Sequence, residues 1–103
     1  MKRGEIWTIA GGADYAIIIQ GNKFNTFQSI TICPLTGTPV DAAPARFVIA
    51  PSAKNGLQIS SHVMVDKIAT IPKSKAGRRI GELDSDDVQL LNQHVAVFLG
   101  LAE

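Results

Sequence analysis

The sequence has 103 residues, of which 46% are apolar and 18% are charged, with ten Lys and Arg against nine Asp and Glu. These values are typical of one folded domain, here residues 1–103, and exclude a disordered chain, a long solenoid or an eight-fold βα barrel. No apolar run approaches the roughly 18 residues that a membrane-spanning helix needs. The N-terminus is charged, with no signal-peptide core, and Cys33 is the only cysteine. We therefore expect a cytoplasmic protein without disulfides or membrane contact.

Strand patterns fill the first two thirds of the chain. Residues 5–9 alternate polar and apolar side chains, and residues 15–20 contain a β-branched run typical of a strand buried on both faces. Residues 28–35 and 46–50 are two further predicted strands, and residues 57–59 and 61–71 are extended pieces. Turn residues recur every eight to twelve positions, and no helix separates the strands, so we expect a small antiparallel barrel or a strongly bent sheet.

The end of the chain has helical periodicity. Asp84 is a suitable N-cap, apolar residues then recur at three- and four-residue spacing, and Gly100 ends the pattern. The pattern predicts one helix of about fifteen residues. Its apolar arc is broad, which indicates burial against the sheet on one side and against a partner on the other.

Few residues suggest chemistry by their pattern alone. His62 and His94 lie in a strand and a helix pattern and are expected at the surface or an interface, and nothing in the sequence has the spacing of a metal site. Cys33 lies in an apolar strand and is expected to be a buried, inert thiol. Thr36 follows that strand, where its hydroxyl either binds a phosphate oxygen or caps its own turn.

Five ordered segments of the chain resemble the MazF/PemK-like toxins, the mRNA interferases of toxin–antitoxin systems. These are residues 3–7 (RGEIW), 17–20 (IIIQ), 34–36 (PLT), 65–71 (VDKIATI) and 80–84 (IGELD). The resemblance implies an SH3-like β-barrel with a C-terminal helix, of the CcdB/MazF type, acting as a homodimer and neutralised by a MazE-like antitoxin. It also implies a cofactor-free, metal-independent endoribonuclease. In such an enzyme the 2′-hydroxyl of single-stranded RNA attacks the adjacent phosphate and leaves a cyclic phosphate and a 5′-hydroxyl.

The family's catalytic threonine matches Thr36, but its arginine, in an Arg-Pro pair before the second strand, has no counterpart. Asp14 and Tyr15 stand there instead. An arginine binds phosphate through two parallel hydrogen bonds, whereas an aspartate repels it. Two interpretations follow. Either the protein lacks this loop and is a weak or inactive nuclease, or, as we favour, a further mobile segment belongs between about Ala13 and Ile17.

RNA binding also needs cations and aromatic platforms. Lys23, Phe24 and Asn25 offer a cation, a ring and an amide in one loop, although Phe24 could instead fold onto the core. Lys67 lies in a segment that resembles one of the family's, near the site in the implied fold, and is expected to bind RNA. The alternative is that Asp66 holds Lys67 in a structural ion pair. Residues 73–79 carry four basic side chains, which form either an RNA track or a solvated loop.

A second functional class shares the expected fold. CcdB-like toxins are not enzymes and poison DNA gyrase through the end of their last helix. The final residues here, 100–103 (GLAE), lack the Trp-Gly-Ile-like ending of that branch, which disfavours this alternative.

Overall fold

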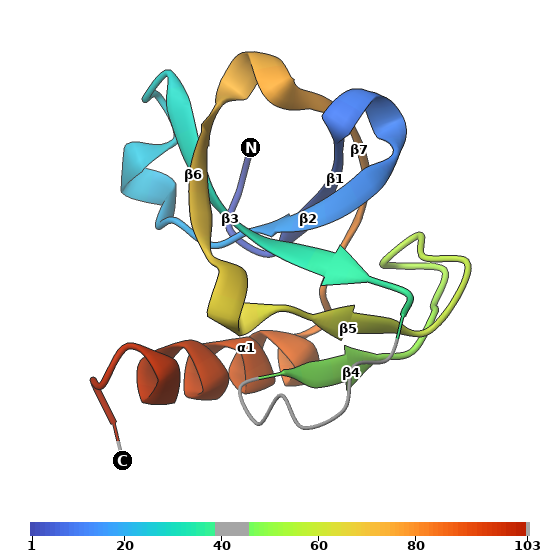
Figure 1. The fold of residues 1–103 in the computed structure, drawn as a ribbon, viewed down its shortest axis with the longest axis vertical. Coiled ribbons are helices and arrows are strands. Elements are labelled where there is room, and N and C mark those ends of the chain that lie inside the picture. The colour runs from blue at the N-terminus through green and yellow to red at the C-terminus, as the bar shows by residue number, and fades with distance from the viewer. Residues whose placement is uncertain (39–45, 103) are drawn as a thin grey trace.

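The structure, a computed structural model, describes residues 1–38 and 46–102, which form one curved antiparallel sheet packed against one α-helix (Figure 1). The strand order is β4-β5-β3-β2-β1-β7, and β6 also pairs with β3. The elements are β1 (Glu5–Ile9), β2 (Asp14–Ile18), β3 (Ser29–Thr36), β4 (Phe47–Ile49), β5 (Ser61–Val63), β6 (Ala69–Pro72), β7 (Ala76–Glu82) and α1 (Ser85–Phe98). Four short 3-10 helices join them: η1 (Ala10–Gly12), η2 (Asn22–Phe24), η3 (Val65–Lys67) and η4 (Lys73–Lys75).

The longest strand, β3, organises the curvature. One edge of β3 pairs with β2, while its other edge pairs with β6 over Ser29–Ile32 and with β5 at Leu35 and Thr36. Because two strands share one edge of β3, the sheet bends between them at η3. In Figure 1, β1, β2, β3, β6 and β7 curve round one interior, and β4 and β5 lie beside α1. The expected small barrel with a C-terminal helix is therefore confirmed, with a sheet that curves without closing.

The sheet buries a cluster of side chains on each face, as the β-branched run at residues 17–19 predicts. Ile17 and Cys33 point to the face covered by α1, where Leu91 is fully buried. Ile18 and Ile32 point to the opposite face, inside the curve, together with the half-buried Trp7. Burial of large side chains on both faces is the main term that stabilises the fold.

Both expectations of extended pieces need correction. Residues 57–59 form no strand, and the 3-10 helix η3 divides the piece 61–71 into β5 and β6. The basic stretch 73–79 is not a loop either, because its second half lies in β7. Gly77 and Gly81 interrupt the strand pattern of β7, so the sequence does not predict it. Glycine is nevertheless required at position 81, because a Cβ there would lie 2.3 Å from the carbonyl carbon of Asn55. The buried side chain of Asn55 holds this turn through hydrogen bonds to Ser52, Ala50 and Leu57.

The turn between β1 and β2 is short and complete. The strands pair as far as Ile9 and Asp14, and the Ala13 N–H donates to the Ala10 carbonyl at 3.3 Å. Ala10, Gly11 and Gly12 all have positive φ, which is why two glycines stand here. The full sequence holds no further residues between Ala13 and Ile17. The chain therefore lacks the loop that would carry the family's arginine. The interpretation favoured above is wrong, and the other one stands: without this arginine, any cleavage depends on the remaining residues of the site and is expected to be weak or absent.

The helix α1 follows its sequence pattern. The Asp84 carboxylate accepts the Asp87 N–H at 2.9 Å, as an N-cap does. Leu91 packs into the core, flanked by the partly buried Val88 and Val95. The C-terminal turns leave apolar side chains in solvent: Val97, Phe98, Leu99 and Leu101. The second apolar side of the helix is thus uncovered in the single chain. No helix within the described residues is long and apolar enough to cross a membrane.

Candidate functional site

A pocket of about 430 Å³ opens where β3 ends. It lies between the start of β2, the residues that follow Leu35 on β3 and the segment 57–59. Thr36 stands on its wall and is half-buried, so its hydroxyl is neither sealed in the core nor fully in solvent. This is the position that the sequence predicts for a phosphate-binding hydroxyl at a strand end.

Among the residues that the structure describes, the Thr36 hydroxyl has one hydrogen-bond partner. Its Oγ1 accepts the Thr38 N–H at 3.2 Å, so the turn-capping role weighed above is present. A hydroxyl that accepts one hydrogen bond still has its own hydrogen to donate. The two roles are therefore compatible: the backbone contact orients Oγ1, and the hydrogen stays available to an oxygen in the pocket.

The charge of the pocket differs from expectation. Of the described residues that line it, only Asp14 carries a charge, and none is Lys or Arg. The cations that RNA binding needs are therefore absent from the described lining of this pocket. The short β1–β2 turn contributes to the difference, because its residues 10–13 include no Lys or Arg and it brings Asp14 next to the end of β3.

The predicted RNA-binding residues Lys23, Phe24 and Asn25 lie at the other end of β3. They form η2 and the residue after it, and Figure 1 shows this segment far from the C-terminal end of β3. Seven residue steps at about 3.3 Å place the two ends of the strand about 23 Å apart. The structure thus separates these residues from Thr36 by the length of β3.

Phe24 does not fold onto the core. Phe24 and Phe27 are 47% and 55% exposed and meet edge to face, with ring centroids 5.5 Å apart. They border a second cavity, of about 410 Å³, whose other walls include Gln20, Thr31 and Thr70. The Lys73 ammonium donates to the Asn25 carbonyl and so ties this turn to η4. The result is an exposed aromatic site with hydroxyl groups beside it.

Lys67 is exposed in η3, beside the middle of β3 and close to α1. The alternative pairing with Asp66 is not formed, since the Asp66 carboxylate binds Arg46 through two hydrogen bonds of 2.9 and 3.1 Å. These bonds to the guanidinium hold the pKa of Asp66 below its ordinary value. Lys67 is therefore placed to meet a ligand along the edge of β3.

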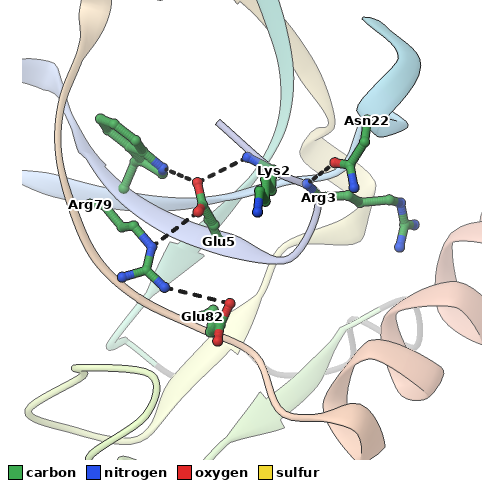
Figure 2. Close-up of polar contacts among 7 residues, drawn as sticks. Lys2, Arg3, Glu5, Asn22, Arg79 and Glu82 are labelled. Carbon is green, nitrogen blue, oxygen red and sulfur yellow. Dashed lines mark hydrogen bonds and ion pairs between the residues drawn. The ribbon is translucent and has the colours of Figure 1, made fainter. Parts of the chain in front are cut away.

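The N-terminal signature, residues 3–7, is a structural network (Figure 2). The Glu5 carboxylate accepts the Lys2 N–H at 2.9 Å, the Trp7 indole N–H at 3.0 Å and the Arg79 Nε–H at 3.1 Å. Burial favours the neutral acid, but these donors and the positive charges nearby outweigh it and lower the pKa of Glu5. Arg79 also forms an ion pair with Glu82 at 3.5 Å. This residue of the basic stretch therefore links β7 to β1 through its contacts with carboxylates.

The remaining titratable candidates separate clearly. Cys33 is buried, and burial raises the pKa of its thiol to about 12, in agreement with an inert thiol. His94 stacks on Phe47 with ring centroids 4.7 Å apart, so it packs at the edge of the core rather than at the open surface. His62 pairs with Thr36 across β3 and β5, a neighbour that the sequence alone did not reveal because the two residues are 26 positions apart.

Among the described residues, no three His, Cys, Asp or Glu side chains gather as a metal site would need.

Comparison with known proteins gives consistent matches. Residues 2–99 match the family described as PemK-like, MazF-like toxin of type II toxin–antitoxin systems. A probable endoribonuclease MazF from Mycolicibacterium smegmatis is 35% identical over 108 residues, which cover 99% of each chain. A solved endoribonuclease from a mycobacterial species is 25% identical, with a TM-score of 0.82 over 97% of this chain and 91% of that one. A mycobacterial endoribonuclease solved in complex with its cognate antitoxin is 24% identical and has the same fold, with a TM-score of 0.84 over 100% of this chain and 98% of that one.

Proposed function

Because the chain belongs to the PemK-like, MazF-like toxin family of type II toxin–antitoxin systems, we propose that it is an endoribonuclease that cleaves single-stranded mRNA in the cytoplasm. The observation that carries this proposal is the half-buried Thr36 hydroxyl at the end of β3, in a pocket of about 430 Å³. A relative that is 35% identical over its whole length is a probable endoribonuclease, which supports the same activity.

In the proposed reaction the RNA supplies its own nucleophile. The 2′-oxygen loses its proton and attacks the adjacent phosphorus, the bond from phosphorus to the 5′-oxygen breaks, and that oxygen takes up a proton. The products are a 2′,3′-cyclic phosphate and a 5′-hydroxyl, and the sequence of steps needs no metal. Negative charge grows on the non-bridging phosphate oxygens in the transition state, where a donor aimed at them is most effective. The hydrogen that Thr36 retains is suited to this role.

The substrate binds along β3 in this proposal. Phe24 offers a ring face for base stacking, Lys23 and Lys67 offer cations for phosphates, and Asn25 offers an amide for a base edge. These groups are spread along a strand about 23 Å long. A flexible RNA of several nucleotides reaches from Thr36 to the aromatic site, whereas a single nucleotide does not.

Two protein partners complete the proposal. The apolar side chains at the C-terminal end of α1, from Val97 to Leu101, suit a homodimer contact, since exposed patches of this kind mark interfaces. The second partner is a MazE-like antitoxin that covers the RNA-binding surface. A mycobacterial protein with this fold has been solved in complex with its cognate antitoxin, which supports such a partner.

The test incubates the purified protein with a long single-stranded RNA in the presence of a chelator. We expect discrete fragments that end in cyclic phosphates. Thr36→Ala should lower kcat by about ten- to a thousandfold, the range for loss of one transition-state donor. Thr36→Ser is the matched control, because it keeps the hydroxyl and should retain most of the activity. Intact RNA with the wild-type protein would refute the nuclease and favour either an inactive member of the family, without its arginine, or a non-catalytic toxin of the CcdB type.

A further inference from the structure

Three polar side chains stand in one row across the sheet at the end of β3. Thr36 pairs with His62 on β5. On its other side, Tyr15 pairs with Leu35, so the next position of β2, Asp14, comes beside Thr36, and both residues line the same pocket. Residues that are directly opposite in an antiparallel pair project to the same face, with Cα atoms about 4.5–5.5 Å apart. The sheet thus sets Thr36 between a carboxylate and an imidazole.

The proposed reaction requires a group that removes the proton of the 2′-hydroxyl. In the described lining of the pocket there is no Lys or Arg to assist, and the turn before β2 carries none. Among the described residues, Asp14 and His62 are the titratable side chains that flank Thr36 in the sheet, while Tyr15, which also lines the pocket, pairs with Leu35 instead. Asp14 is exposed and bears the same sign of charge as the phosphate. Histidine is the side chain that ordinarily exchanges a proton near neutral pH, and it is the commonest general base in enzymes.

We infer that His62 is the general base of this RNA cleavage, an inference that rests on the proposed endoribonuclease function. A neutral imidazole nitrogen of His62 takes the proton from the 2′-hydroxyl while the 2′-oxygen bonds to phosphorus. The bond from phosphorus to the 5′-oxygen breaks with its electron pair on that oxygen, which takes a proton from a water molecule. The imidazolium then returns its proton to solvent, so the step balances. Thr36 binds a non-bridging oxygen of the same phosphate.

The spacing suits this division of work. His62 is not among the described residues that line the pocket, and it adjoins the site through its pairing with Thr36. The 2′-oxygen and the non-bridging oxygens belong to neighbouring groups of one nucleotide, and paired side chains on adjacent strands reach neighbouring atoms. His62 is half-buried, and its partner on the other side, Val48 of β4, is 51% exposed, so RNA has access to this face.

Among the described residues of β2, β3 and β4 and the residue just before β4, the charged ones are Asp14 and Arg46. Asp14 lies one strand beyond Thr36. Arg46, just before β4, lies diagonally across from His62 but is held by the two hydrogen bonds to Asp66. Within the described part of β3 and β4, the residues directly opposite His62 are Thr36 and Val48, neither of which titrates. Loss of a pH dependence of cleavage on substitution of His62 would therefore not arise from the residues directly opposite it in β3 and β4.

The test compares His62→Gln with the wild-type protein in RNA cleavage as a function of pH. We expect kcat to fall by about 100-fold or more, the usual contribution of a general base, with little change in KM. We also expect the rate of the wild-type protein to fall as the pH is lowered, because a protonated base cannot accept a proton, and this dependence should be absent from the variant. His94→Gln is the matched control, because His94 stacks on Phe47 of the core and does not adjoin Thr36.

Chemical rescue separates proton transfer from structural damage. In His62→Gly, added imidazole should restore cleavage in proportion to its neutral form, which a purely structural role of His62 would not allow. Cleavage by His62→Gln within threefold of the wild-type rate, with the same pH profile, overturns this inference and leaves the nuclease function standing. Failure of the wild-type protein to cleave RNA overturns the proposed function, and the role of His62 falls with it.

Discussion

Replacement of Leu91 by alanine tests whether α1 is fastened to the sheet as described. Leu91 is 0% exposed and is the one buried residue of the helix, packed among the side chains of the larger core cluster. The change removes three carbon groups, worth about 0.8 kcal/mol each in transfer free energy, and leaves a cavity that adds to this cost. We expect a loss of about 3 kcal/mol in the free energy of unfolding.

Such a loss is large for a domain of this size, whose total stability is of the order of 5–15 kcal/mol. The corresponding fall in Tm is about 12–24 °C, at about 4–8 °C for each kcal/mol. Urea unfolding followed by circular dichroism at a fixed protein concentration measures the loss in the free energy of unfolding, and thermal unfolding measures the fall in Tm. Equal slopes for wild type and variant would show that the unfolding reaction is unchanged.

Leu90→Ala supplies the matched control, because it makes the same chemical change one position earlier on the helix. Leu90 is 38% exposed, so its truncation should cost less than half as much. Equal losses for the two variants, or a loss below about 1 kcal/mol for Leu91→Ala, would refute the packing argument. A loss in Leu90→Ala that depends on protein concentration would instead identify Leu90 as part of a contact between copies.

Two further predictions concern titratable groups. The pKa of Glu5 is lowered in the folded protein, so its charge stabilises the fold above the pKa of the unfolded state, and this contribution disappears as the pH falls through the folded value. Glu5→Gln should therefore be less stable than the wild type at pH 7, with the difference in unfolding free energy shrinking towards acid; a pH-independent difference would contradict this. Cys33 should not react with a thiol reagent at pH 8 in the native protein, since its thiol is buried with a pKa of about 12, and should react fully in urea. Rapid labelling of the native protein would show that the strand opens.

Much of the architecture is local in origin and was therefore predictable. Alternation located β1, a β-branched run located β2, and the Asp84 cap with helical spacing located α1, because each signal lies within a few residues of the element that it specifies. The strand β7 escaped notice for the opposite reason. A side chain at Gly81 would collide with the backbone of Asn55, which lies 26 positions earlier in the chain, and the Arg79 side chain donates a hydrogen bond to Glu5.

The candidate site divides in the same way. The sequence by itself determined that Thr36 ends a strand, that Lys23, Phe24 and Asn25 share a turn, and that the chain resembles a family of toxins, since all three are properties of neighbouring residues or of ordered motifs. Only the tertiary structure decided that Asp14 and His62 flank Thr36 and that the aromatic turn lies at the far end of β3. Strand register joins residues that are distant in sequence, and it follows from how the two faces of the sheet pack, which no short segment encodes.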